Sequence, residues 1–499
     1  MTAVSTELTK YKMFIGGKKV DAVAGGLFES LNPYTGKAWA AIPDGREEDV
    51  DRAVAAASEA LEDPQWKGMV PMERGLLLRR FGDLLRENAE SLARIETRDN
   101  GKLIREMLGQ ARALPSYYYY YAGLADKILG ETIPLEKTSI FNYTLREPVG
   151  VVAIITPWNS PLLLLSFSLA AALACGNTVV VKPSEHASAS TLEFAGLAEK
   201  AGFPPGVFNV ITGFGRTTGG PLVGHPGVNK VVFTGGARTG KGIGQLASAN
   251  LTPTLLELGG KSPNIVFADA SIPDAVNGCI AGIFAASGQT CLAGSRLFLH
   301  EKIYDEFIGR LVERTRKIKM GDPSVMESEM GPMATTDQLH KVEGFVERAI
   351  KEGAELIYGG KRPEDPALGQ GWFFMPTIFG RMRNDMDLAR EEVFGPVLAV
   401  MRFREEEEVI ALANETRYGL AAGIWTNDVK RAHRVARALK AGTVWINTYR
   451  ALSYASPFGG YKQSGYGREM GLEAIREFTQ VKSVWVDLAE TVPDPFVIR

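Results

Sequence analysis

The stretch Val149-Gly-Val-Val-Ala-Ile-Ile155, followed by the loop Thr156-Pro-Trp-Asn159, decides the fold of this chain. It is a short run of β-branched and apolar residues that ends in a polar loop, which is typical of a strand buried on both faces of a parallel sheet. Further runs of this kind follow, with helical stretches between them: Thr178–Val181, Val207–Ile211, Val231–Phe233, Leu255–Leu258 and Asn264–Phe267. This alternation predicts a doubly wound α/β sheet.

The loops that follow these strands are the first place to look for a site. In a doubly wound sheet, ligands bind in the crevice beyond the carboxyl ends of the strands. The loops that meet this condition are Thr156–Asn159, Lys182–Glu185, Gly213–Gly215, Thr234–Gly236 and Gly259–Gly260.

The chain on either side of this region is also patterned. Met13–Val20 predicts two short strands around a Gly-Gly turn. Beyond Leu297 a second α/β domain is predicted. The amphipathic helical patterns before and after the central sheet cover about Glu47–Leu61, Met72–Thr97, Leu103–Ala125, Tyr304–Met320, Asp337–Glu352, Glu407–Thr416 and Val429–Leu439. The tyrosine run Tyr117–Tyr121 faces all sides of its helix, and packing is its predicted role.

Composition excludes several classes of function. With 499 residues and a net charge of −2, the chain can bury more than one core and offers no basic field for nucleic acid. Met1–Lys12 lacks the apolar core of a signal peptide, and Pro161–Cys175 is too short to cross a bilayer, so a cytoplasmic protein without a membrane partner is expected. The three cysteines show no CxxC spacing, which argues against a disulfide framework and a metal site.

One of these cysteines lies in an unusual setting. The stretch Phe284-Ala-Ala-Ser-Gly-Gln-Thr-Cys-Leu-Ala-Gly-Ser295 surrounds Cys291 with small residues. Little bulk near the sulfur would let a substrate carbonyl approach it. From these residues alone, an inert buried thiol is as good an interpretation as a nucleophile.

Phosphate-binding patterns offer a different class of function. Gly235-Gly-Ala-Arg-Thr-Gly-Lys-Gly242 nearly matches the phosphate loop GxxxxGK[ST], but Gly242 replaces the hydroxyl that would hold magnesium. Ile265–Asp269 resembles the accompanying strand, so an ATPase or kinase is the alternative enzyme. Gly213–Gly219 matches the dinucleotide pattern GxGxxG only loosely. A Cys-His hydrolase is disfavoured, because no motif ties any of the five histidines to Cys291.

Seven motifs, taken together, are far more specific than any of these. They are Pro157–Asn159, Lys182–Glu185, Phe233–Gly235, Leu256-Glu-Leu-Gly-Gly-Lys261, Gly288-Gln-Thr-Cys291, Glu392-Val-Phe-Gly-Pro396 and Pro457-Phe-Gly-Gly-Tyr-Lys462. In this order and at these spacings the chain resembles the aldehyde dehydrogenase superfamily, from near Met13 to near Val486.

The resemblance implies a fold of two doubly wound α/β domains with a small β oligomerisation arm. Residues 1–125 and 147–257 would form the NAD-binding domain, 258–463 the catalytic domain, and 126–146 with 478–499 the arm. It also implies NAD as cofactor, a small aldehyde as substrate, and a homodimer or homotetramer. A catalytically idle relative is disfavoured because Cys291, Glu257 and Asn159 are all present.

The chemistry of the reaction fits these three residues. A thiolate at Cys291 can add to an aldehyde, and the adduct becomes a thioester once hydride is lost. Glu257, flanked by apolar residues at a strand end, would have a raised pKa and would activate water. The Asn159 amide and the Cys291 backbone N–H would stabilise the oxyanion.

The resemblance also implies a set of cofactor contacts. Lys182 and Glu185 would hold the adenosine ribose, so we expect NAD to be preferred over NADP. Gly236 replaces a serine found in many members. The full predicted set is Ile155, Thr156, Pro157, Trp158, Lys182, Ser184, Glu185, Gly215, Phe233, Gly235, Gly236, Leu258, Gly259, Glu392 and Phe394.

The resemblance also implies the substrate-facing positions, which are mostly apolar. They fall near Leu164, Phe167, Thr290, Leu292, Leu452 and Phe458. An uncharged aliphatic or aromatic aldehyde is therefore favoured, although the nearby Arg450 leaves a carboxylate-bearing aldehyde open. Glu469 matches a second glutamate near the family's water or proton path.

Overall fold

Two large, mainly parallel sheets form the body of the protein in the computed structural model, which describes residues 8–492 and 494–496. Residues 1–7, within the segment predicted to lack a signal peptide, lie outside the described residues. So do residues 493 and 497–499 of the predicted arm. The division of the chain into domains at the predicted boundaries stays a prediction.

The first sheet has eight strands, and its five central strands run parallel. In spatial order they are β20 (Gly465–Tyr466), β12 (Thr254–Glu257), β11 (Lys230–Thr234), β8 (Val151–Thr156), β9 (Thr178–Pro183), β10 (Phe208–Val210), β2 (Met13–Ile15) and β3 (Lys18–Val20). β20 and the β2–β3 hairpin are antiparallel additions at the two edges.

One predicted strand does not belong to this sheet. The segment Asn264–Phe267 forms β13 (Pro263–Val266), which pairs in the second sheet. The neighbouring position beside β12 is taken by β20, a strand from far along the chain. After β12 the chain therefore crosses to the second sheet through Gly259 and Gly260.

The second sheet has seven strands, and β15 is its antiparallel edge. They are, in spatial order, β15 (Glu355–Tyr358), β16 (Thr377–Gly380), β17 (Val397–Phe403), β14 (Arg296–His300), β13, β18 (Ala421–Trp425) and β19 (Thr443–Ile446). Alternate residues of β14 enter different cores: Leu297 and Leu299 join one cluster and Phe298 the other, as the two-residue period of a strand requires.

Helices cover both faces of each sheet, so the strands are buried. The longer ones are α1 (Glu47–Glu62), α3 (Pro71–Glu87), α4 (Ala89–Asn100), α5 (Ile104–Ala122), α6 (Pro161–Ala174), α7 (Ala189–Ala201), α9 (Ala237–Ser248), α10 (Ile272–Ile283), α11 (Tyr304–Arg316), α12 (Thr336–Lys351), α14 (Glu406–Asn414) and α15 (Val429–Ala438). The short ones are α2 (Pro64–Lys67), α8 (Gly220–Gly224), α13 (Asp387–Arg390) and α16 (Glu473–Glu477). None of the described helices is long and apolar enough to span a membrane.

Two helical predictions can be compared with particular elements. The apolar run Pro161–Cys175 forms α6, which is apolar on all sides because it is buried on all sides. The pattern Met72–Thr97 was predicted as one helical stretch, but it forms α3 and α4 with a break at Asn88. The Asn88 side chain donates to the Leu84 carbonyl oxygen at 2.8 Å, competing with the backbone for the end of α3.

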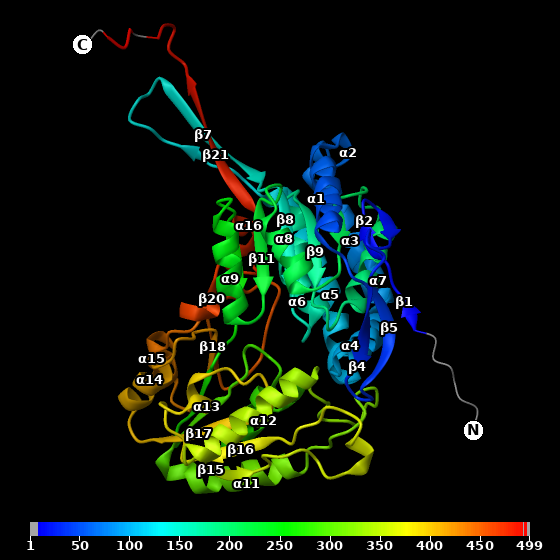
Figure 1. Ribbon diagram of the computed structural model, residues 1–499. Helices are drawn as coiled ribbons and strands as arrows, with labels where there is room; N and C mark the ends of the chain where they lie inside the picture. Colours follow the sequence, from blue (N-terminus) through cyan, green and yellow to red (C-terminus); the bar gives the residue numbers. More distant parts are fainter. Residues whose placement is uncertain (1–7, 493, 497–499) are drawn as a thin grey trace.

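Two small sheets complete the fold. β1 (Thr9–Lys10), β5 (Lys37–Pro43) and β4 (Leu27–Asn32) form one of them. The other, β21 (Thr479–Asp487), β7 (Ile140–Pro148) and β6 (Thr132–Ile133), projects from the end of the body that carries the first sheet (Figure 1). This projecting sheet joins the two segments that were predicted to form an arm.

Candidate active site

Cys291 sits in a tight loop between α10 and β14, where the two sheets meet. The residues before it turn sharply: Ala286, Ser287 and Gly288 all have positive φ. At Gly288 a side chain is excluded twice, because φ is +70° and an added Cβ would lie 2.1 Å from the Gly395 carbonyl oxygen. Cys291 as a residue is partly exposed, whereas Cys175 and Cys279 are buried.

Asn159 reaches this loop from the first sheet. It follows β8, is only 5% exposed, and donates an N–H from Nδ2 to the Gln289 carbonyl oxygen at 3.0 Å. Gln289 is itself fixed, because its Oε1 accepts the Ala334 N–H at 2.9 Å. The amide of Asn159 is therefore held beside Cys291 and keeps a second N–H for another acceptor.

Glu257 is the last residue of β12 and is 3% exposed. Neither of its carboxylate oxygens has a hydrogen-bond partner among the described residues. Burial, followed by the charge of Glu469, raises the pKa of the Glu257 carboxyl well above its ordinary value. Glu469 accepts the Ser168 hydroxyl proton at 2.7 Å, and its own pKa is raised to about 7, chiefly by burial.

The electrostatics around the thiol favour its neutral form. Burial, followed by the charges of Glu392 and Glu257, raises the pKa of Cys291 to about 12. A thiol of this kind needs a proton acceptor or added positive potential before it can act as a nucleophile.

A groove of about 540 Å³ runs along the carboxyl ends of β8, β9 and β11, and we call it the strand-end groove. α9 begins at its floor with Gly236 as N-cap, and nothing lies within 4 Å of the place where a Cβ of Gly236 would be. The predicted cofactor residues that line it are Ile155, Thr156, Pro157, Trp158, Lys182, Ser184, Glu185, Gly215, Phe233, Gly235 and Gly236.

Two smaller cavities meet at Cys291. The junction cavity, of about 170 Å³, is lined by Cys291, Glu257 and Asn159 and shares Pro157, Trp158 and Gly235 with the strand-end groove, among others. The α5–α6 cavity, of about 300 Å³, lies on the other side of the thiol. The residues common to the junction cavity and the α5–α6 cavity are Asn159, Leu164 and Cys291.

Four predicted cofactor residues lie outside the strand-end groove. Gly259, Glu392 and Phe394 line the junction cavity. Glu392 accepts the Gly260 N–H at 3.1 Å, and the ring of Phe394 meets that of Trp158 edge-on at 5.3 Å. Leu258 lines neither cavity nor the groove; its side chain packs under α9, against Gly240.

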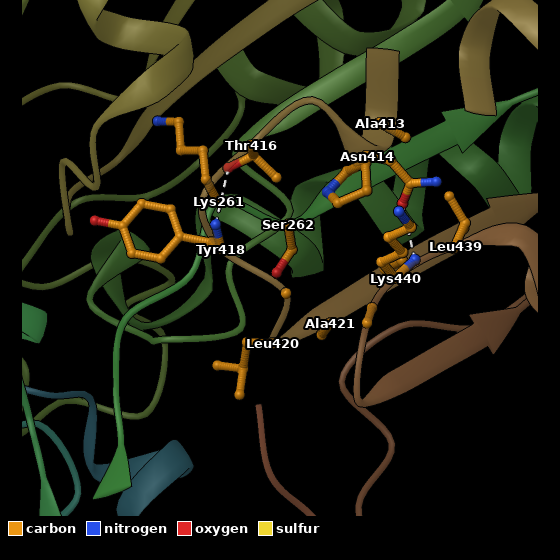
Figure 2. A pocket seen from close by; sticks show the side chains of 14 residues that line it. Lys261, Ser262, Ala413, Asn414, Thr416, Tyr418, Leu420, Ala421, Leu439 and Lys440 are labelled. Atoms are coloured by element: carbon orange, nitrogen blue, oxygen red, sulfur yellow. Dashed lines mark hydrogen bonds between the residues drawn. The ribbon is translucent and has the colours of Figure 1, made fainter. Parts of the chain in front are cut away.

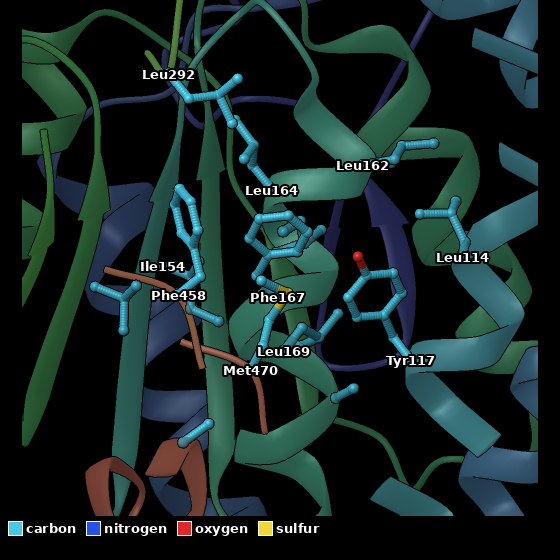
Figure 3. Packing of buried hydrophobic residues seen from close by; sticks show 14 of the residues in the cluster. Leu114, Tyr117, Ile154, Leu162, Leu164, Phe167, Leu169, Leu292, Phe458 and Met470 are labelled. Atoms are coloured by element: carbon cyan, nitrogen blue, oxygen red, sulfur yellow. The ribbon is translucent and has the colours of Figure 1, made fainter. Parts of the chain in front are cut away.

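The α5–α6 cavity has an apolar wall made of the positions predicted for the substrate. Leu164, Phe167, Leu292 and Phe458 gather there, with Tyr117 stacked on Phe167 at a ring distance of 5.4 Å (Figure 3). Thr290, Leu452 and Arg450 line it as well. Lys102, Gln110 and Tyr117 also line this cavity but were not predicted from the sequence, because they come from the α5 region and belong to no motif near Cys291.

The phosphate-loop alternative fails on geometry. Lys241 lies inside α9, not in a loop before it, and donates from Nζ to Gln463 Oε1 at 3.2 Å on the surface. Asp269 follows β13 in the other sheet and accepts hydrogen bonds from Thr426 and Arg431. Neither residue can therefore serve the phosphate site that the pattern suggested.

Lys261, the last residue of the Leu256–Lys261 motif, does not line the strand-end groove. It borders a separate cavity of about 10 Å³ with Thr416 and Tyr418 (Figure 2), which has room for a single water molecule. Burial lowers the pKa of Lys261 to about 7, and its Nζ has no hydrogen-bond partner among the described residues.

The sequence and structure also match known proteins. The sequence model of the aldehyde dehydrogenase family matches residues 20–484. The chain is 48% identical to a (Z)-2-((N-methylformamido)methylene)-5-hydroxybutyrolactone dehydrogenase from Acinetobacter baylyi, over 99% of this chain and 100% of that protein. It is 44% identical to a betaine aldehyde dehydrogenase from Bacillus subtilis, over 95% and 96%.

Solved structures agree with this. A betaine aldehyde dehydrogenase from Staphylococcus aureus, solved with NAD+, matches with a TM-score of 0.96 at 40% identity, covering 98% of this chain and 97% of that one. An aldehyde dehydrogenase from Bacillus cereus, also in complex with NAD+, matches with a TM-score of 0.94 at 45% identity, covering 96% and 97%. The chain belongs to the aldehyde dehydrogenase family.

Proposed function

We propose that this protein oxidises an aldehyde to its carboxylic acid, with NAD as the hydride acceptor and Cys291 as the nucleophile. One observation carries the proposal. Cys291, Glu257 and Asn159 line one junction cavity, which shares residues with the strand-end groove on one side and with the α5–α6 cavity on the other. A thiol, a base and an amide donor thus meet where a cofactor and a substrate would approach each other.

In the first half of the reaction, the Cys291 thiol loses its proton to water, the thiolate adds to the aldehyde carbon, and the carbonyl oxygen becomes an oxyanion. The free N–H of Asn159 and the backbone N–H of Cys291 stabilise this charge. A bound NAD would supply the hydride acceptor, and once that carbon has lost its hydride the adduct on Cys291 is a thioester.

In the second half, Glu257 removes a proton from water, which attacks the thioester. The carbon–sulfur bond breaks, the acid leaves, and the Cys291 thiolate is regenerated. Burial suits Glu257 to this role, because a carboxylate with a raised pKa is a stronger base than an exposed one. Glu469 lies close enough to raise that pKa further, and we propose that it belongs to the same proton path.

The strand-end groove fits a dinucleotide. A helix N-terminus with an open approach at Gly236 suits a pyrophosphate, because the free N–H groups of α9 point at the ligand. At the other end of the groove, Lys182 Nζ lies 3.6 Å from Glu185 Oε2, and both line it. We propose that this pair binds the adenosine ribose, and that Glu392 and Phe394 hold the nicotinamide ribose.

The test is to add an aldehyde and NAD to the purified protein and follow the absorbance of NADH. We expect turnover in the wild type and none with Cys291→Ala, while NAD binding is kept because the groove is lined by other residues. Cys279→Ala is the matched control, since that thiol is buried away from the cavities. Near-normal turnover in Cys291→Ala, or nucleotide hydrolysis without NAD, would reject the proposal.

We also propose that the protein is a homodimer or homotetramer that assembles through the projecting sheet. Leu145, Val481 and Trp485 are exposed on this sheet, and β21 is one of its edge strands. Exposed apolar side chains and open strand edges are normally covered by a partner. Light scattering at micromolar concentration tests this, and a monomer would contradict it.

The lining of the α5–α6 cavity bears on the class of aldehyde that this protein oxidises. The sequence favoured an uncharged aldehyde, and the apolar wall supports an aliphatic or aromatic body for the substrate. Betaine aldehyde, named for two of the relatives, carries a quaternary ammonium group, but no acidic residue lines the α5–α6 cavity in the described part of the chain. We therefore propose that betaine aldehyde is a poor substrate of this protein.

A further inference from the structure

Two cationic residues line the α5–α6 cavity, and no acidic residue lines it among the described residues. Lys102 precedes α5, and Arg450 follows β19. The cavity also holds the reactive thiol and an apolar wall, so a substrate lying in it would meet Cys291 at one end and positive charge elsewhere.

Neither cation forms an ion pair among the described residues. Arg450 uses Nη1 to donate to the Ala281 carbonyl oxygen at 3.1 Å. Lys102 donates from Nζ to Ser160 Oγ at 2.9 Å. A guanidinium carries five N–H groups and an ammonium three, so both retain unused donors.

The acids nearest to Lys102 are already engaged elsewhere. Glu106 accepts the Ala286 N–H at 2.9 Å, and Glu96 accepts the Leu162 N–H at 3.0 Å. Their charges act on Lys102, but neither side chain lines the cavity. An anion inside the cavity would thus find two cations at its surface and no competing carboxylate there.

The backbone holds Arg450 in an unusual conformation. Its φ is +65°, a region that non-glycine residues keep only where the surroundings enforce it. The surroundings do so here: Tyr449 donates its hydroxyl proton to the Leu292 carbonyl oxygen at 3.0 Å, and Trp445 donates from Nε1 to the Ala451 carbonyl oxygen at 2.8 Å. The first bond ties the Arg450 segment directly to the residue after Cys291.

We propose that the physiological aldehyde carries a carboxylate at the end away from the aldehyde group, and that Arg450 is the residue that binds it. The inference rests on the proposed function and names its substrate class. The guanidinium fork matches a carboxylate with two parallel hydrogen bonds, and Lys102 adds a second positive charge. Phe167 and Phe458 line the same cavity, so we expect the middle of the substrate to be apolar.

The experiment compares matched aldehydes that differ only in the remote group. Para-carboxybenzaldehyde is paired with para-methylbenzaldehyde, and linear ω-carboxyaldehydes are paired with linear aldehydes of the same length. For the wild type we expect kcat/KM to favour the charged member by about tenfold or more in at least one pair. Betaine aldehyde should be the poorest probe.

The variants assign this preference to one residue. Arg450→Leu should lower kcat/KM for the charged aldehyde by about 10- to 100-fold and for its neutral partner by less than about threefold, because one charge-assisted contact is lost. For Arg450→Lys, kcat/KM with the charged aldehyde should lie between the values of the wild type and Arg450→Leu, because lysine keeps the positive charge but cannot form two parallel hydrogen bonds. Arg94→Leu, which removes an exposed arginine of α4, is the control and should change neither value.

Two results would overturn the inference. One is a wild type that oxidises no charged aldehyde better than its neutral partner, and the other is an Arg450→Leu variant that loses both activities alike. If neutral aldehydes are still oxidised in a Cys291-dependent way, only this inference fails. If no aldehyde of either class is oxidised, the proposed function fails with it.

Discussion

The strand-end groove and the α5–α6 cavity are connected through the junction cavity, yet they are built in different ways. The groove is formed by loops that follow three neighbouring parallel strands, so the topology of the first sheet places them together. The cavity is formed by side chains from α5, α6, the Cys291 loop and the segment after β19. A site of the first kind is fixed by the fold, whereas a site of the second kind is free to vary with individual side chains.

Glu257 gives the sharpest test of the region between the groove and the α5–α6 cavity, because it lines only the junction cavity. Glu257→Gln should reduce steady-state turnover by about 10³-fold, since no group then activates water. The first hydride transfer should survive and leave a thioester on Cys291, to be detected by rapid mixing and mass spectrometry. Full turnover without any adduct would mean that Glu257 is structural.

Asn159 lines both the junction cavity and the α5–α6 cavity, so its loss should affect chemistry more than binding. Asn159→Ala should lower kcat by about 10²- to 10³-fold, the usual effect of removing one oxyanion donor. The KM for the aldehyde should change little. The Asn159 side chain also donates to the Gln289 carbonyl oxygen, so thermal unfolding of the variant should be measured as a control. A large drop in its unfolding temperature would mean that the loss of activity comes from lost stability and not from the missing oxyanion donor.

The protonation state of Cys291 reports on the cavities before any ligand binds. Because the pKa of the thiol is raised to about 12, the thiol is protonated at pH 7 and its thiolate fraction grows with pH. Alkylation by iodoacetamide without NAD should therefore speed up by about tenfold per pH unit between pH 7 and 9. Cys291→Ala supplies the background rate. A rate independent of pH would show that the thiolate is already formed.

Glu185 tests the groove without touching the cavity, and its effect should be the smallest. NADP would place a phosphate against its carboxylate, a repulsion of roughly 4 kcal/mol at 4 Å and an effective dielectric of 20, which Lys182 partly offsets. We expect the wild type to prefer NAD by about 10- to 100-fold and Glu185→Ser to reduce that preference by about tenfold. The KM for the aldehyde should stay unchanged.

A wild type that favours NADP would contradict this prediction. So would a cofactor preference that Glu185→Ser leaves untouched, because Glu185 would then not be the residue that discriminates.

The same contrast explains how far the sequence could lead. Thr156, Lys182, Glu185 and Gly235 could be predicted as groove residues because they follow recognisable strands, and the structure brings them to one groove. Leu258 follows a strand too, but its side chain turns under α9, and the motif carries no sign of that direction.

Lys102, Gln110 and Tyr117 could not be found in this way. They lie far from Cys291 in the chain, and the spacing of Gln110 and Tyr117 along α5 is also that of a helix face packed on a core. Tyr117 does pack, on Phe167, while it lines the cavity. The wrong placement of Asn264–Phe267 has a similar cause, since the edge beside β12 is filled by β20, which is distant in sequence.

The pairing of β12 with β20 also determines when the first sheet can be completed during synthesis of the chain. During synthesis the first sheet can assemble as far as β12, but the outer edge of that strand stays open until Gly465 and Tyr466 leave the ribosome. Glu257 faces Gly465 in this pairing, so the surroundings of Glu257 are completed only when nearly the whole chain has been made. A nascent or truncated chain that lacks β20 would expose an unpaired strand edge, the kind of surface that invites aggregation and recruits chaperones.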